Sequence, residues 1–341
     1  MFIQFSQRFT RLFSASLPLA IATLCTAAPL AIAQTPFRFV AIGDMPYSEA
    51  EQDAFNTDIR RAISAADVPF VVHYGDLKGG GESCTDALLT ARRNDIESLH
   101  PDRVFYTPGD NEWTDCDRDF LDVQFSELDR LAKLRDLFFR EPMAVPADWD
   151  YARQPNFSEN ARWQQENVIF LTLHVVGTNN GRQEILLDDP AAAIALVNAR
   201  DEANRVWVEQ AFEIAQQESA KAVVIVTQAD VSDPDGTAPC TPTNPSDCDG
   251  YLTVREQIIA AAAAWGQPVL FVHGDTNPYC LDQEFGGEQA PKLWRLNAWG
   301  DFQSPPDATE ITIQSGNAAE PFVIQTLMGQ QAPTVGCQPE S

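Results

Sequence analysis

The chain has 341 residues, 44% of them hydrophobic, and a formal net charge of −26 from 23 Lys and Arg against 49 Asp and Glu. A protein this acidic repels the phosphate backbone of nucleic acids, and no basic run interrupts the acidity, so we expect no nucleic-acid partner. The length allows a single large α/β core.

The first 33 residues predict a cleaved secretory signal peptide. Two arginines precede an uncharged apolar stretch that ends at residue 33, and residues 31–33 have the small-x-small pattern of a cleavage site. A membrane anchor is the alternative, but two prolines and many alanines in the apolar stretch favour cleavage. We therefore expect a secreted or periplasmic protein with no membrane partner after cleavage, whose single domain spans residues 34–341.

Six cysteines follow residue 33, and an even number in an exported chain predicts disulfides. Six cysteines permit fifteen pairings, among which the sequence cannot choose. Local pairing is the simplest hypothesis for the two that bracket the turn-rich loop 240–248. The pairs that we expect are Cys84–Cys116, which would clamp two acidic loops together, Cys240–Cys248 and Cys280–Cys337.

In chain order, five short apolar runs each end in an aspartate. The five aspartates are Asp44, Asp76, Asp110, Asp230 and Asp275. Each run has the length and the Val, Ile and Phe content of a strand. Their apolarity is continuous rather than alternating, which indicates strands that are buried on both faces.

Helical patterns lie between several of these strands. Ser48 and Glu51 form a capping box, and apolar residues then follow at helical spacing up to residue 66. Residues 123–139 and 203–215 are two further amphipathic segments. Strands that alternate with helices predict parallel βαβ connections.

Other strands are predicted without helices between them. Residues 167–177 form one apolar run, and three more follow residue 275 at 292–301, 308–314 and 321–328. These closing strands indicate a mixed sheet or a second sheet.

The five aspartates predict a metal site. Ligands of open α/β sheets bind at the carboxyl ends of the strands, which is where all five would lie. A single Asp after a strand is ordinary turn chemistry, and five independent turns are the alternative. Clustered carboxylates repel one another, however, and burying them is costly unless a cation is present.

The order and spacing of these motifs resemble the calcineurin-like metallophosphoesterase superfamily. The similar stretches are "GDMPY" (43–47), "GDLKGG" (75–80), "PGDNE" (108–112), "TQAD" (227–230) and "HGDTN" (273–277). The resemblance implies a single-domain, four-layer α/β/β/α sandwich of mixed sheets. It also implies two metal ions, bridged by a shared Asp and a hydroxide, that promote in-line attack on a phosphorus ester.

Matching the motifs residue by residue implies a set of metal ligands, with Asp76 as the bridging carboxylate. The set is Asp44, Asp76, Asp110, Gln228 and Asp275. The family's other motif positions are altered, because Pro46, Asn111 and Asn277 stand where it has histidines and Gly79 where it has an aspartate.

The ligand set, which is rich in oxygen donors, favours hard cations such as Mn, Mg or Ca over Zn or Fe. Four carboxylates would neutralise two dications, and a neutralised pair acidifies its water less, so we expect weak or alkaline-shifted activity.

Three further residues are candidates for catalysis. Asn111 replaces the family's proton donor, and His273 lies two residues before Asp275 with a core role as its alternative. Lys78 would hold a phosphate oxygen or replace a lost metal charge, and a solvated loop position is its alternative.

Two functions remain open on the sequence. The first is an exported metallophosphoesterase that acts on a small phosphorylated substrate. The second is a weak or inactive descendant of the fold that binds a cation or a phosphorylated ligand. The lost histidines support the second, and the retained carboxylates support metal binding in both.

Overall fold

The computed structural model describes residues 1–4, 6–8, 10, 36–234, 236–276, 278–314, 317 and 319–337. The expected signal-peptide core and its cleavage site at 31–33 lie outside the described residues. The chain divides into two units, Met1–Thr35 and Pro36–Ser341, and the second contains every helix and strand that the structure describes. None of the helices in the described ranges has both the length and the apolar character of a membrane span.

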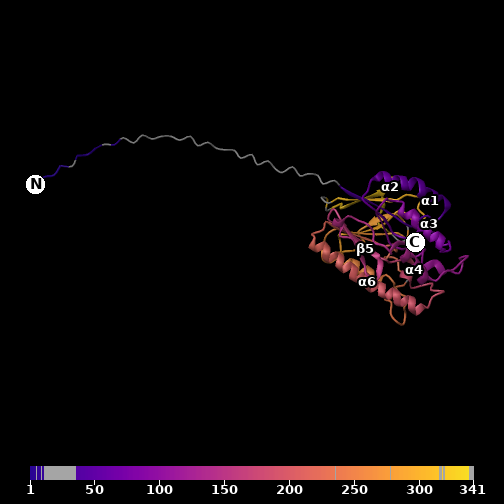
Figure 1. The fold of residues 1–341 in the computed structure, drawn as a ribbon. Coiled ribbons are helices and arrows are strands. Elements are labelled where there is room, and N and C mark those ends of the chain that lie inside the picture. Colours follow the sequence, from indigo (N-terminus) through magenta and orange to yellow (C-terminus); the bar gives the residue numbers. More distant parts are fainter. Residues whose placement is uncertain are drawn as a thin grey trace. The chain divides into compact units, whose positions relative to one another are not determined.

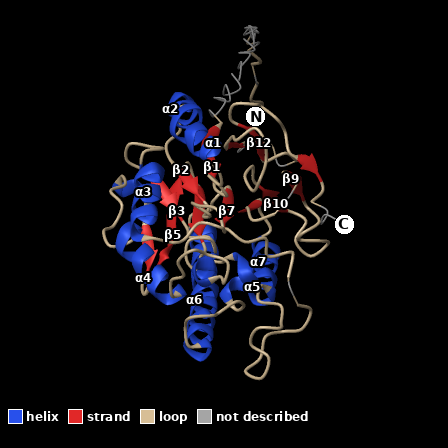
Figure 2. Cartoon of the chain, turned by 90° about the vertical axis from the view of Figure 1, so that its right-hand side faces the viewer, coloured by secondary structure: helices blue, strands red, loops and turns tan. Residues whose placement is uncertain are grey.

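Two mixed sheets form the centre of the second unit (Figures 1 and 2). The smaller sheet has the strand order β12-β11-β1-β2-β3, and the larger has the order β13-β9-β10-β8-β7-β6-β5-β4. The strands are β1 (Phe37–Ile42), β2 (Val71–His73), β3 (Val104–Tyr106), β4 (Ala152–Gln154), β5 (Phe157–Gln165), β6 (Val168–Thr172), β7 (Ala222–Val226), β8 (Val269–His273), β9 (Cys280–Asp282), β10 (Leu293–Asn297), β11 (Thr309–Ile313), β12 (Phe322–Thr326) and β13 (Thr334–Val335).

The strands that precede the five aspartates are confirmed as β1, β2, β3, β7 and β8. In the smaller sheet β1, β2 and β3 run parallel, and in the larger sheet β6, β7, β8 and β10 run parallel. The carboxyl ends of parallel neighbours lie at one edge of a sheet. Each sheet therefore presents several aspartates, or the loops that carry them, at a single edge.

Helices join β1 to β2, β2 to β3, β6 to β7 and β7 to β8, as expected, and further helices lie between β3 and β4. They are α1 (Glu49–Ala54), η1 (Phe55–Ile59), α2 (Arg60–Ala66), α3 (Asp86–Glu97), η2 (Thr114–Asp117), α4 (Glu127–Phe138), η3 (Ala147–Trp149), α5 (Gly177–Gly181), α6 (Pro190–Gln217) and α7 (Leu252–Trp265). The Ser48 hydroxyl caps the first helix by accepting from the Glu51 amide at 3.2 Å. The expected segment 123–139 is α4, and 203–215 is the second half of the longer α6.

Three hydrophobic clusters show that the elements stack as α/β/β/α, the expected four-layer arrangement. The cluster between the sheets joins Phe39 and Phe105 of the smaller sheet to Trp163 of the larger one, and the Phe105 and Trp163 ring centroids lie 3.6 Å apart. The other two clusters join the outer face of each sheet to its helices. Burying a side chain of this size stabilises the fold by about 2–3 kcal/mol.

The three expected disulfides are present. They are Cys84–Cys116, Cys240–Cys248 and Cys280–Cys337. The first joins the loop after β2 to η2, which follows β3, and its cysteines are 32 residues apart. Closing a loop of this length stabilises a fold by about 3–4 kcal/mol in the chain-entropy model. Three disulfides indicate an oxidising environment.

Candidate metal centre

Carboxylates from both sheets meet at the carboxyl ends of the strands. Asp76 follows β2, Asp110 follows β3 and Asp275 follows β8. One carboxylate oxygen of each lies within 4.8 Å of the other two. Asp76 and Asp110 are buried and Asp275 is half-buried. At this spacing the three oxygens could hold one cation.

Asp44 lies beside this group at the end of β1. Its Oδ2 accepts a hydrogen bond from the Asp275 amide at 3.2 Å. The side chain is 1% exposed, and Oδ1 has no hydrogen-bond partner among the described residues. A buried carboxylate oxygen without a donor costs free energy unless a cation compensates it. The residues present therefore fit a metal ion.

Burial raises the pKa of Asp44, Asp76 and Asp275 well above the usual range. Neighbouring carboxylates raise it further: Asp301 is the strongest charged contributor at Asp44, and Asp110 at the other two. Like charges at close range oppose ionisation. The cluster is therefore stable near neutral pH only if it holds protons or cations.

Amide and hydroxyl groups hold two of these carboxylates in place. Asn111 donates from its side chain to Asp76 Oδ2 at 2.9 Å and from its backbone to Asp76 Oδ1 at 3.3 Å, and the Tyr47 hydroxyl donates to Oδ2 at 3.0 Å. Gln228 donates from Nε2 to Asp110 Oδ1 at 3.1 Å, while its Oε1 accepts from the Gly177 amide at 2.8 Å.

These contacts define where the predicted Asn111 and Gln228 lie. Asn111 is bonded to Asp76, the carboxylate expected to bridge the metals. Gln228 turns its amide nitrogen, which cannot ligate a cation, toward Asp110. If the Gln228 amide were flipped, its N–H group would face the N–H group of Gly177. The two hydrogen bonds therefore determine the amide orientation. In this arrangement Gln228 orients the Asp110 carboxylate, and its own Oε1 accepts from the Gly177 amide.

Lys78 lies inside the protein, with 0% exposure. Its Nζ donates to the Gly79 carbonyl at 3.0 Å, and its charge acts on Glu112, Asp115 and Asp76. Burial lowers its pKa. Lys78 therefore lies near buried negative charge and is not a solvated loop residue.

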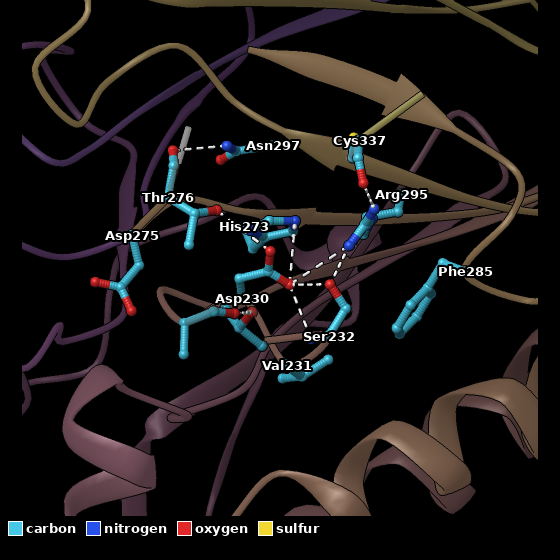
Figure 3. A network of polar contacts seen from close by, with 12 residues as sticks. Asp230, Val231, Ser232, His273, Asp275, Thr276, Phe285, Arg295, Asn297 and Cys337 are labelled. Carbon is cyan, nitrogen blue, oxygen red and sulfur yellow. Dashed lines mark hydrogen bonds and ion pairs between the residues drawn. The ribbon is translucent and has the colours of Figure 1, made fainter. Parts of the chain in front are cut away.

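His273 faces away from the carboxylate cluster (Figure 3). The fully buried ring contacts the Gly274 carbonyl through Nδ1 at 2.9 Å, and its Nε2 lies 3.8 Å from Asp230 Oδ1. Figure 3 shows the Asp275 carboxylate pointing to the opposite side. Proximity in the sequence therefore does not bring the imidazole to the cluster, because β8 ends at His273 and the chain turns before Asp275, whose φ is 68°.

Asp230, the remaining strand-end aspartate, belongs to a separate polar network (Figure 3). Its Oδ1 accepts from the Ser232 amide at 2.8 Å and lies 3.7 Å from Arg295 Nη1. Its Oδ2 accepts from the Thr276 hydroxyl at 3.2 Å, which fixes the residue after Asp275. Asn277, the next motif position, lies outside the described residues.

Three contributors to the site are absent from the sequence-based set. Thr178 donates to Asp110 Oδ2 at 3.2 Å and to Asp115 Oδ1 at 2.7 Å. Tyr47 bonds to Asp76 from within the quoted motif at 43–47. Asp301 follows β10 and is preceded by a glycine, as are Asp44, Asp76, Asp110 and Asp275 at their strand ends. This Gly-Asp motif could have identified Asp301 from the sequence.

A polar cavity of about 360 Å³ adjoins the cluster. Its lining includes Asp110, Asp275, Thr178 and Arg118, and Arg118 is the one cationic side chain among the described lining residues. Arg118 pairs with Asp115 at 2.5 Å and with Glu184 at 2.8 Å. A larger cavity of about 720 Å³ lies against α3 and α4 and contains none of the four clustered aspartates, so the smaller cavity is the relevant one.

Gly177 offers a test of the cluster geometry. A methyl group there would overlap Asp110 Oδ2 and lie 2.9 Å from Asp275 Oδ2. We expect Gly177→Ala to push the two carboxylates apart and weaken Mn²⁺ binding at least tenfold, with about 1–3 kcal/mol lost in stability. Isothermal titration measures the affinity. Gly81→Ala is the matched control, since a Cβ there meets nothing within 4 Å. Equal Mn²⁺ affinity in both variants would contradict the geometry.

No family model matches this chain, and no curated protein matches its sequence. Among solved structures, the chain is similar to PhoD with a TM-score of 0.46 and 10% identity over 85% of this chain and 68% of that one. It is similar to GAP50, the anchor in the inner membrane complex of Plasmodium, with a TM-score of 0.44 and 10% identity over 89% and 98%. It is also similar to the Haemophilus influenzae NAD nucleotidase NadN, with a TM-score of 0.39 and 12% identity over 85% and 49%. Similarities at this level assign no function to this chain. Its layered fold and its carboxylate cluster are described from its own structure.

Proposed function

We propose that this chain is an exported, metal-dependent phosphoesterase that hydrolyses a phosphorus ester of a small molecule. The convergence of the Asp76, Asp110 and Asp275 oxygens within 4.8 Å carries the proposal. The buried, unpartnered Oδ1 of Asp44 supports it, as does the resemblance of the strand-end motifs to metallophosphoesterases. The three disulfides support a secreted or periplasmic location.

In this proposal Asp44, Asp76, Asp110 and Asp275 hold two divalent cations, with Asp76 shared between them. Carboxylate oxygens favour hard cations, so Mn, Mg or Ca is the expected metal. When bound, such cations would lower the pKa of water and offset the negative charge of the phosphorus ester.

The chain's own residues hold and orient the reactants. Asn111 and Tyr47 fix Asp76, and Gln228 and Thr178 fix Asp110, through the hydrogen bonds described above. The substrate would enter the cavity of about 360 Å³, which suits a small phosphorylated molecule and not a nucleic acid. Arg118, at the cavity wall, would exchange its exposed partner Glu184 for the oxygens of the phosphate group.

A specific observation favours the second candidate, a cation-binding protein with little or no turnover. All four histidines have their recorded polar contacts outside the cluster: His73 with Gly75, His100 with Val68, His174 with Glu159 and His273 with Asp230. Among the described residues, therefore, no imidazole stands beside the carboxylates to protonate a leaving group.

Purified mature protein tests the proposal directly. We expect about two Mn²⁺ per chain by elemental analysis, and hydrolysis of simple phosphomonoesters or phosphodiesters that depends on Mn²⁺, Mg²⁺ or Ca²⁺. The rate should increase toward alkaline pH, because four carboxylates neutralise the cations and leave the attacking water less acidic. Cation binding without turnover would favour the second candidate. No bound cation, with a melting temperature unchanged by chelator, would overturn both.

A further inference from the structure

Four aspartates share one unusual local structure. Asp44, Asp76, Asp275 and Asp301 each follow a glycine shortly after a strand, and their φ angles are 49°, 52°, 68° and 26°. Positive φ is uncommon for residues with a side chain, and such strain gathers at functional sites. Three of the four form the centre described above, and Asp301 shares with them both the preceding glycine and the positive φ.

The strand order brings the four turns together in pairs. Asp44 and Asp76 follow β1 and β2, which are parallel neighbours in the smaller sheet. Asp275 and Asp301 follow β8 and β10, which are parallel neighbours in the larger sheet. Each sheet therefore contributes two adjacent Gly-Asp turns in which the aspartate has a positive φ, and the turn with Asp301 completes the second pair.

Close contacts place the Asp301 turn against Asp44. A Cβ at Gly300 would lie 3.0 Å from the Cβ of Asp44 and 2.8 Å from the Gly43 carbonyl oxygen. The Tyr74 hydroxyl donates to the Trp299 carbonyl at 2.8 Å, which anchors the start of the turn. Only a glycine at position 300 lets the two turns approach this closely.

The negative charges of Asp44 and Asp301 favour a bound cation between them. Asp44 is 1% exposed, its Oδ1 has no partner among the described residues, and the turn that carries Asp301 packs against the Cβ of Asp44. An unsatisfied carboxylate oxygen next to a second carboxylate is unfavourable unless a positive charge lies between them. On the Asp44 side, none of the four histidines has a recorded contact that could supply a ligand in place of an acid.

We propose that Asp301 is a fifth carboxylate ligand of the centre and holds, together with Asp44, the cation on the Asp44 side. The inference rests on the proposed function, because it needs a metal centre at this edge. It makes the donor set more acidic than the motif resemblance implies. A site with five carboxylates selects hard divalent cations more strongly than one with four.

The test compares Asp301→Asn with wild-type protein by Mn²⁺ titration, using calorimetry and the electron paramagnetic resonance of free Mn²⁺. Asn keeps the size of Asp and tolerates the left-handed backbone, and it removes only the charge. We expect two bound Mn²⁺ in wild type, and in the variant one of the two bound at least tenfold more weakly. Asp67→Asn is the matched control, because Asp67 is exposed and also has a left-handed φ of 50°.

A second readout separates ligation from a structural role. Without metal, Asp301→Asn should melt at the same temperature as wild type or higher, since a repelling charge is gone. With Mn²⁺, its gain in melting temperature should be smaller than that of wild type. Two cations bound with wild-type affinity in the variant would overturn the inference and leave the proposed function intact. No cation bound by wild type would overturn both.

Discussion

Replacing Asp76 by Asn is expected to abolish binding of one or both cations and to reduce kcat/KM roughly a thousandfold, the equivalent of about 4 kcal/mol. Asp76 is 2% exposed, and one of its oxygens lies within 4.8 Å of an oxygen of each of the two other convergent carboxylates. Asn fits the same space and the same φ of 52°, and it can still accept from the Tyr47 hydroxyl. The fold should therefore survive while the charge that holds the cations is lost.

Mn²⁺ titration and steady-state kinetics on the same preparation measure this effect. Asp67→Asn serves as the control, since it removes one charge from a left-handed aspartate after α2, on the exposed surface. The control should retain wild-type cation binding and turnover. If Asp76→Asn keeps both cations and stays within tenfold of wild-type kcat/KM, the carboxylate cluster is not the reactive centre.

Removing the metal is expected to destabilise the protein far more at pH 8 than at pH 5. Burial raises the folded-state pKa of Asp44 and Asp76. A raised carboxyl pKa stabilises the fold below the unfolded value of about 4, and that stability is lost as pH rises through the folded pKa. Bound cations would offset the loss by compensating the ionised carboxylates.

Melting curves with and without EDTA measure this dependence. The drop in Tm caused by EDTA should be at least about 5 °C larger at pH 8 than at pH 5, given about 2 °C per kcal/mol for a large domain. Burial raises the pKa of Asp115 to about 8, so its ionisation lowers the stability of the fold near pH 8 both with and without EDTA. An EDTA effect that is equal at the two pH values would contradict cation binding by raised-pKa carboxylates.

The strands could be predicted well because the local pattern specifies them. β7 and β8 are continuous apolar runs that are buried on both faces, as β1 is from Phe39 onward, and such runs are stable only inside a layered sheet. The polar β5 and the short β9 were missed, since their pairing depends on neighbouring strands rather than on their own composition. The first half of α6 was also missed, although Asp189 and Pro190 mark its start.

The site was predicted only in part. The strand-end positions of Asp76 and Asp110 predicted that they meet, because β2 and β3 are parallel neighbours that end at a common edge. Asp275 follows β8 of the other sheet, and the packing of the two sheets brings it to them. The burial of Lys78, the amide orientation of Gln228 and the turn of His273 toward Asp230 could not be predicted. Each depends on side-chain contacts between segments that are far apart in the sequence, and the spacing of motifs contains no information on these contacts.

By itself, the sequence determined the apolar strands, that several of them end in aspartate, and that the cysteines suffice for three disulfides. Only the tertiary structure decided which aspartates meet. Asp301 shows the difference most clearly: its Gly-Asp turn has the same local wording as the others, but its place beside Asp44 depends on β10 pairing with β8 and on the two sheets facing each other. Electrostatic energy depends on distances in space, and those distances are set by strand order and layer packing, not by position along the chain.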